Sequence, residues 1–367
     1  MAQPKRDPAD VAAERDLEID RRLGTETPQL GKLSEALFEA YTAEAWGFDQ
    51  FSAIADEEQR AVASDLTLSA VEGVEVNLRE MALCLMDLDE LVGPNGRTMP
   101  GPETTVEELI DGKRTHRAVT DFTRAFGSTL DCLAAATIAV LCLPSSIQSA
   151  SGASLLNVIE LPAAAPASQQ EARGRAANLI EAHAERDPAG WLAWMLELRN
   201  AVIHRGHLTG VWMTMPRKGS GPQLAVWSET GISHLIRMQP HLRGKPWQPD
   251  MLSLTGPETP ADALIWLPEP TTATLREVKV RAVALAEELS ELLLDLFTGE
   301  RTDWELPEAK WRLERVTGRP REAKAAQFKG FDPDYPAPPP SEMRVHPRSA
   351  QRLELAERLR QANQEAD

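Results

Sequence analysis

The sequence predicts a mainly α-helical protein, an antiparallel helical bundle with a small β-hairpin or three-strand insert and an additional N-terminal helical region. Apolar residues recur at helical spacing through most of residues 28–300. Glycine and proline gather where these periodic segments stop, as they do at helix ends. Only between residues 208 and 267 does the pattern change to short runs with strand character. Helices therefore account for most of the expected core.

Charge is distributed unevenly along the chain. The 367 residues include 39 Lys+Arg and 56 Asp+Glu, which gives a formal net charge of -17. Residues 35–111 hold 18 acidic and three basic side chains, whereas residues 310–329 hold seven basic and two acidic ones. So acidic a chain argues against indiscriminate nucleic-acid binding. A local site for an anionic ligand is still compatible with it, because salt confines surface fields to roughly 8–10 Å.

Several classes of protein are excluded by composition. The most apolar stretch, Cys132 to Leu143, has 12 residues including one threonine, whereas a bilayer-spanning helix needs about 20, so we expect no contact with a membrane. The charged N-terminus lacks the apolar stretch of a signal peptide. Three cysteines (Cys84, Cys132 and Cys142) are an odd number without metal-ligand spacing. We therefore expect buried, reduced thiols in a cytoplasmic protein that uses neither a metal nor a cofactor.

Five regions follow from the changes in composition. They are a mobile N-terminal tail (1–27), an acidic helical region (28–112), a helical domain (113–300) with a β insert at about 208–267, a basic segment (301–330), and a Pro-rich linker with a charged helical tail (331–367). The expected helices are Leu30 to Trp46, Phe51 to Val92, Arg117 to Leu143, Gln169 to Arg186, Asp187 to Arg205 and Thr274 to Gly299. Met99 to Asp111 is expected as a loop or a short element, and an interruption of the second helix would fall near Asp65 or Gly73.

One segment carries residues suited to catalysis, Glu197 to Gly206. On an ideal helix Glu197, Asn200 and His204 share one face. The opposite stripe is apolar and consists of Trp191, Met195, Leu198 and Val202. Arg199 lies about 140° around the helix from His204 and reaches the same cleft only from the flank.

The residue types in this segment suit phosphate chemistry. His204 falls in the last helical turn, where the helix dipole favours the imidazolium and raises its pKa toward neutrality. Such a histidine transfers protons in both directions. The guanidinium of Arg199 suits a phosphate whose negative charge grows during reaction. Asn200 and Glu197 are supporting candidates, and Arg205 and His207 are candidates for contacting RNA phosphate.

The run Arg199-Asn200-x-x-x-His204 resembles the signature of the HEPN superfamily, helical proteins in which four to six residues separate an arginine from a following histidine. This resemblance implies a four-helix core and metal-independent endoribonuclease activity in a homodimer whose motif helices meet across a two-fold axis. It implies that His204 is the general acid or base, Arg199 the phosphate clamp and Asn200 an orienting group. It further implies a toxin–antitoxin or antiviral defence role, with RNA as substrate and a neutralising or activating protein partner.

Other interpretations remain open at this stage. A catalytically inactive HEPN-like module would act as a binding or scaffold protein, and Arg199 and His204 would then be a solvated helix face. Residues 310–329 would either bind RNA phosphate or pair with the acidic residues 35–111. His183 is expected on the surface, and Trp191 and Trp194 are expected to anchor the motif helix in the core.

Overall fold

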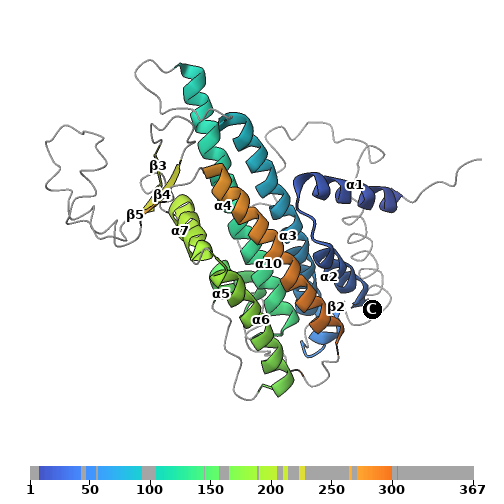
Figure 1. Ribbon diagram of the computed structural model, residues 1–367. Helices are drawn as coiled ribbons and strands as arrows, with labels where there is room; N and C mark the ends of the chain where they lie inside the picture. Colours follow the sequence, from blue (N-terminus) through green and yellow to red (C-terminus); the bar gives the residue numbers. More distant parts are fainter. Residues whose placement is uncertain are drawn as a thin grey trace, which may run out of the picture.

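A computed structural model gives the arrangement of the chain (Figure 1). It describes residues 8–42, 47–54, 57–92, 105–143, 145–156, 165–187, 190–204, 210–213, 223–227, 264–266, 271–299 and 304. The helices are α1 (Pro8–Leu23), α2 (Pro28–Glu39), α3 (Glu57–Val92), α4 (Val106–Val140), α5 (Gly152–Leu156), α6 (Ala167–Glu185), α7 (Trp191–His204) and α10 (Thr271–Thr298). Short 3-10 turns lie at Asp49–Phe51 and Ile147–Ser149. The mainly α-helical class is confirmed.

Two small antiparallel sheets accompany the helices. Strands β1 (Tyr41–Thr42) and β2 (Gly47–Phe48) pair with each other between α2 and α3. Strands β3 (Gly210–Met213), β4 (Gln223–Trp227) and β5 (Leu264–Trp266) form a sheet in the order β3-β4-β5. These three strands lie where the sequence predicts the β insert.

The long helices α3 and α4 form the centre of the bundle and run antiparallel. Asn77 Nδ2 lies 4.0 Å from Cys132 Sγ, and further along α3 Met81 Sδ lies 4.0 Å from Thr129 Oγ1. The helix α3 continues without interruption through Gly73, where a Cβ would stand 2.8 Å from Cys132 Sγ. That glycine therefore serves the close approach of the two helices and does not end α3.

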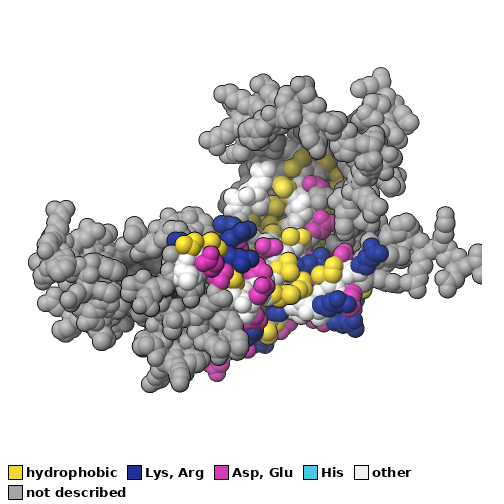
Figure 2. All heavy atoms as spheres, turned by 90° about the horizontal axis from the view of Figure 1, so that it is seen from above, with side chains coloured by type: hydrophobic (Ala, Val, Ile, Leu, Met, Phe, Trp, Pro, Cys, Tyr) yellow, Lys and Arg dark blue, Asp and Glu magenta, His cyan; other side chains and the backbone are white. Residues whose placement is uncertain are grey.

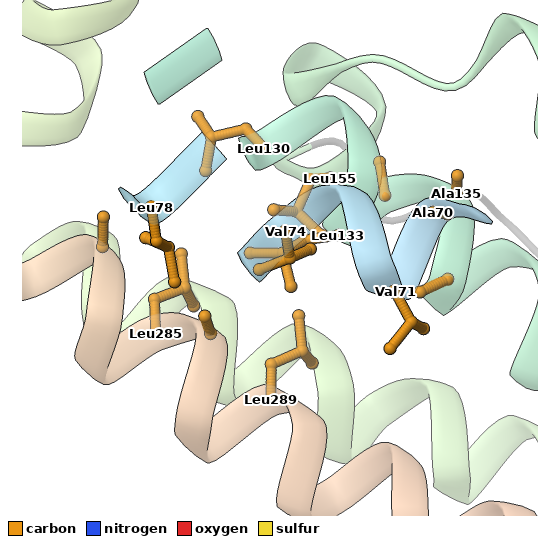
Figure 3. Packing of buried hydrophobic residues seen from close by; sticks show 14 of the residues in the cluster. Ala70, Val71, Val74, Leu78, Leu130, Leu133, Ala135, Leu155, Leu285 and Leu289 are labelled. Atoms are coloured by element: carbon orange, nitrogen blue, oxygen red, sulfur yellow. The ribbon is translucent and has the colours of Figure 1, made fainter. Parts of the chain in front are cut away.

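The main hydrophobic core lies between α3, α4 and α10 (Figure 3). Its members shown there include Val71, Val74 and Leu78 of α3, Leu130 and Leu133 of α4, and Leu285 and Leu289 of α10. Each such side chain contributes about 1.5–3 kcal/mol when it is fully buried. By contrast Val76, Leu83 and Met86 of α3 face solvent with exposed fractions of 61%, 47% and 58%. The apolar type of these three residues therefore does not identify the buried side of α3.

Buried threonine hydroxyl groups of α3 and α4 find partners inside the bundle, whereas the buried Ser290 Oγ of α10 has none among the described residues. The side chains of four buried threonines, Thr67, Thr123, Thr129 and Thr137, each donate to the carbonyl oxygen four residues earlier. A buried hydroxyl without a partner would cost free energy, so this local bonding makes threonine compatible with the core.

The end of α4 has a specific cap. Leu143 N–H donates to the Ile138 carbonyl (3.0 Å) and Cys142 N–H to the Ala139 carbonyl (3.2 Å). Cys142 has φ +50°, so it occupies the left-handed position of a Schellman motif. The next residue in the sequence is a proline, a residue type that disfavours continuation of a helix. The predicted end at Leu143 is thus three residues late.

The N-terminal region differs from the expected mobile tail. Residues 8–23 form α1, and Asp20 accepts two hydrogen bonds of 2.7 Å from the guanidinium of Arg79 in α3. Hydrogen bonding to Asp20 also raises the pKa of Arg79. A long-range ion pair therefore fixes α1 on the bundle. Helix α4 begins at Val106 and not at the predicted Arg117, so it includes the second half of the loop or short element expected at Met99 to Asp111, while residues 99–104 lie outside the described residues.

None of the helices in the described ranges is long and apolar enough to cross a membrane. The basic residues 310–329, the Pro-rich linker and the C-terminal tail lie outside the described residues.

Candidate functional site

The motif segment forms helix α7, but the helix starts later than predicted. The sequence places its start at Asp187 and Pro188, whereas the first helical residue is Trp191, after Gly190 with φ +82°. Arg281 of α10 explains the delay, because its guanidinium donates to the carbonyls of Arg186 and Asp187. The described part of the helix runs to His204, and the residues that follow lie outside the described ranges, so the placement of this residue in the last turn stays a prediction.

The apolar stripe of α7 faces the core. Trp191, Met195 and Leu198 are buried as predicted, and Trp194 is buried beside them. The Trp191 ring meets Phe126 of α4 edge to face at 6.3 Å between centroids, and the guanidinium of Arg281 lies 5.4 Å from the Trp191 ring centre. Trp191 therefore anchors the start of α7 to both α4 and α10.

Arg199 lies against α4. One of its guanidinium nitrogens, Nη2, is 3.2 Å from Asp131 Oδ2, and the exposed fractions of the two side chains are 24% and 32%. The Arg199 chain crosses Gly127 so closely that a Cβ there would stand 2.5 Å from Nε and 3.0 Å from Cδ. Arg199 Nε is buried and has no hydrogen-bond partner among the described residues. The arginine is thus held along its whole length, with part of its side chain still open to solvent.

The Asp131 carboxylate joins three helices. Its Oδ1 accepts a hydrogen bond of 2.6 Å from the N–H of Gly152, the first residue of α5, while its Oδ2 accepts the bond from Arg199 of α7. Gly152 packs closely on Leu130, since a Cβ there would lie 3.1 Å from the Leu130 Cβ. We call Gly127, Asp131, Gly152 and Arg199 the Arg199 junction.

The remaining candidates are located only by the backbone or not at all. Glu197, Asn200 and His204 belong to α7, but their side chains lie outside the described residues. Arg205 and His207 fall outside the described residues altogether. The structure therefore places the side chain of one of the two predicted catalytic residues, Arg199.

His183 corrects a sequence expectation, since it is buried with only 2% of its surface exposed. Its Nε2 lies 3.0 Å from Glu288 Oε2 of α10, its carbonyl accepts a bond of 2.9 Å from Trp191 Nε1, and its Nδ1 is buried without a partner in the described part of the chain. The buried residues Ala172, Ala176 and Ile180 precede it at helical spacing. This helical spacing of apolar residues is the signal in the sequence that indicates that His183 faces the interior.

The thiols are buried or half-buried, as expected. Burial raises the pKa of Cys84 to about 12 and that of Cys132 to about 11, with nearby carboxylates adding to both shifts. Within the described ranges there is no group of three or more His, Cys, Asp or Glu side chains arranged to hold a metal ion.

Seen from above, the described surface carries basic, acidic and apolar side chains close together (Figure 2). No broad area of one charge is visible among the coloured side chains on this face. Comparison of the chain with known protein families, with curated proteins and with solved structures finds no match.

Proposed function

We propose that this protein is a metal-independent endoribonuclease of the HEPN type, active as a homodimer through α7, in which Arg199 and His204 carry out the reaction. A general base takes the proton from a ribose 2′-hydroxyl, and the resulting O2′ bonds to the adjacent phosphorus. The bond from phosphorus to O5′ breaks, and a general acid protonates the leaving oxygen. The products are a 2′,3′-cyclic phosphate and a 5′-hydroxyl, and His204 supplies one of the two proton transfers.

The observation that carries the proposal is the constraint on Arg199. A clamp for a phosphate in the transition state must be oriented before the reaction, because reorganisation during the reaction raises the barrier. Arg199 is held by Gly127 along its aliphatic part and by Asp131 at one nitrogen, and it comes about 1.4 turns before His204 on the same helix. Two such helices across a two-fold axis would bring both residue types to one phosphate.

The test is cleavage of single-stranded RNA in excess EDTA by the wild type, Arg199→Ala and His204→Ala. Arg175→Ala serves as the matched control, since Arg175 forms an exposed surface ion pair with Asp295. We expect cleavage by the wild type and the control, with loss of at least 10²-fold in the other two variants. Equal cleavage by all four folded proteins would refute the assignment of these residues, and an inactive wild-type dimer would refute the activity.

A second candidate is a catalytically inactive HEPN-like scaffold. It is favoured by the ion pair itself, because Asp131 competes with any phosphate for the guanidinium of Arg199. In this case Arg199 stabilises the contact between α4 and α7 and does nothing else. Expression separates the candidates, since a ribonuclease impairs growth in a way that depends on His204, whereas a scaffold is tolerated.

A further inference from the structure

The Arg199 junction contains two residues of α4 that act on Arg199 from the same face. Gly127 and Asp131 are four residues apart, so they lie one above the other on the helix. Gly127 provides the space that the arginine chain occupies, and Asp131 provides the acceptor at its end. Neither residue belongs to the motif that identified α7.

The Asp131 carboxylate is itself fixed. Its Oδ1 is bonded to the Gly152 N–H at 2.6 Å, so rotation of the carboxylate about its Cβ–Cγ bond is opposed by loss of this hydrogen bond. The position of Oδ2 is therefore fixed, and Arg199 Nη2 donates a hydrogen bond of 3.2 Å to it. This bond uses one of the five N–H donors of the guanidinium. It orients the guanidinium and leaves other N–H donors to bind a further acceptor.

We propose that Asp131 is the positioning residue of this site, which orients the Arg199 guanidinium for contact with the scissile phosphate of RNA without touching the RNA itself. The inference rests on the proposed ribonuclease function. A misplacement of a reacting group by about 1 Å can lower a rate by 10²-fold. Removing the acceptor at Oδ2 is therefore expected to lower kcat by about 10- to 100-fold.

The first experiment compares Asp131→Asn with Asp121→Asn. The asparagine retains one oxygen for the Gly152 N–H and places an amide NH2 against Arg199 Nη2. Asp121 is the matched control, because it lies on the same helix and pairs with Arg117 and Arg124 near the surface. At saturating RNA and equal dimer content, we expect the 10- to 100-fold loss of kcat in Asp131→Asn and less than a two-fold change in Asp121→Asn. Equal kcat in both variants overturns the positioning role while leaving the nuclease intact.

A second experiment distinguishes orientation from mere stabilisation. In Arg199→Ala, added guanidinium at about 10–50 mM should restore part of the RNA cleavage, because Asp131 still offers its acceptor for the free cation. In the double variant with Asp131→Asn, no rescue is expected. Equal rescue in both backgrounds contradicts the proposal, whatever the melting temperatures of the two proteins.

A third readout does not depend on activity. In ¹⁵N-arginine-labelled wild type, a guanidinium held at one nitrogen gives separate Nη signals, assigned to Arg199 by their absence in Arg199→Lys. We expect these signals to coalesce in Asp131→Asn and to persist in Asp121→Asn. If the wild type cleaves no RNA, the ribonuclease proposal fails, and with it the role in a reaction; the NMR result still decides whether Asp131 orients Arg199.

Discussion

Replacing Gly127 by alanine tests the junction most directly. The new Cβ would stand 2.5 Å from Arg199 Nε, so the arginine must leave its place. Alanine in a helix interior is worth about 1 kcal/mol over glycine. Two costs oppose this gain. The partly exposed ion pair with Asp131 is lost, which costs about 0–1 kcal/mol. The displaced Arg199 side chain takes a strained rotamer, which costs about 0.5–1.5 kcal/mol. The net change in the free energy of unfolding therefore lies between a gain of about 0.5 and a loss of about 1.5 kcal/mol, so the full gain from alanine is not reached although the site is displaced.

Gly174→Ala is the matched control, because Gly174 lies within α6 and a Cβ there meets nothing within 4 Å. Thermal unfolding should show the full gain of about 1 kcal/mol for Gly174→Ala and little or none for Gly127→Ala. In the RNA assay we expect wild-type cleavage for Gly174→Ala and a loss of about 10- to 100-fold for Gly127→Ala.

Two results would refute this reasoning. An equal gain in stability for both variants would mean that Arg199 does not lie over Gly127. Undiminished cleavage by a folded Gly127→Ala protein, with the arginine shown to be displaced, would mean that the orientation of Arg199 is irrelevant to the reaction.

Four further predictions concern the rest of the bundle. The pKa values of Cys84 and Cys132 are raised to about 12 and 11. At pH 8 both thiols should therefore react with iodoacetamide at least about 10²-fold more slowly in the native protein than in the unfolded protein. Fast labelling of the native protein would contradict their burial. Because folding raises both thiol pKa values, the folded state retains protons that the unfolded state loses above about pH 9. The free energy of unfolding should therefore fall as the pH rises above about 9. Thermal unfolding measured between about pH 8 and 10.5 checks this. His183→Ala should lower the free energy of unfolding by about 1–3 kcal/mol, measured by urea titration, and no change would place this histidine at the surface. Asp20→Ala should free α1 from Arg79 and accelerate protease cleavage within residues 8–23, whereas unchanged digestion would show that other contacts hold this helix.

Elements with a local signal were predictable. Periodic apolar residues located α6 and α10 to within a few residues, and the change of period located β3, β4 and β5. The predicted start of this last helix at Thr274 is three residues late, since α10 begins at Thr271. Helix ends depend on local capping, which several neighbouring residues can satisfy.

Elements fixed by distant partners were not predictable. The charged helix α1 depends on Arg79, 59 residues beyond Asp20, and the start of α7 depends on Arg281 of α10. In the candidate site, the sequence pointed to Arg199, whose side chain the structure describes, and to His204, of which it describes only the backbone. It did not find Asp131, because that residue is 68 positions away from Arg199 and carries no motif of its own. Only packing of α7 on α4 brings the two together.

The packing of α2 on α10 has a consequence for synthesis. The backbone N–H of Gln29 bonds to both carboxylate oxygens of Glu287, a separation of 258 residues. During translation the buried leucines of α2 lack the cover of α10 from the synthesis of α2 until α10 emerges. At about 5–20 residues per second, that interval lasts between roughly 10 and 50 seconds. The nascent chain thus carries a partly uncovered apolar surface for most of its time on the ribosome, and binding of a chaperone to α2 is most needed in that interval.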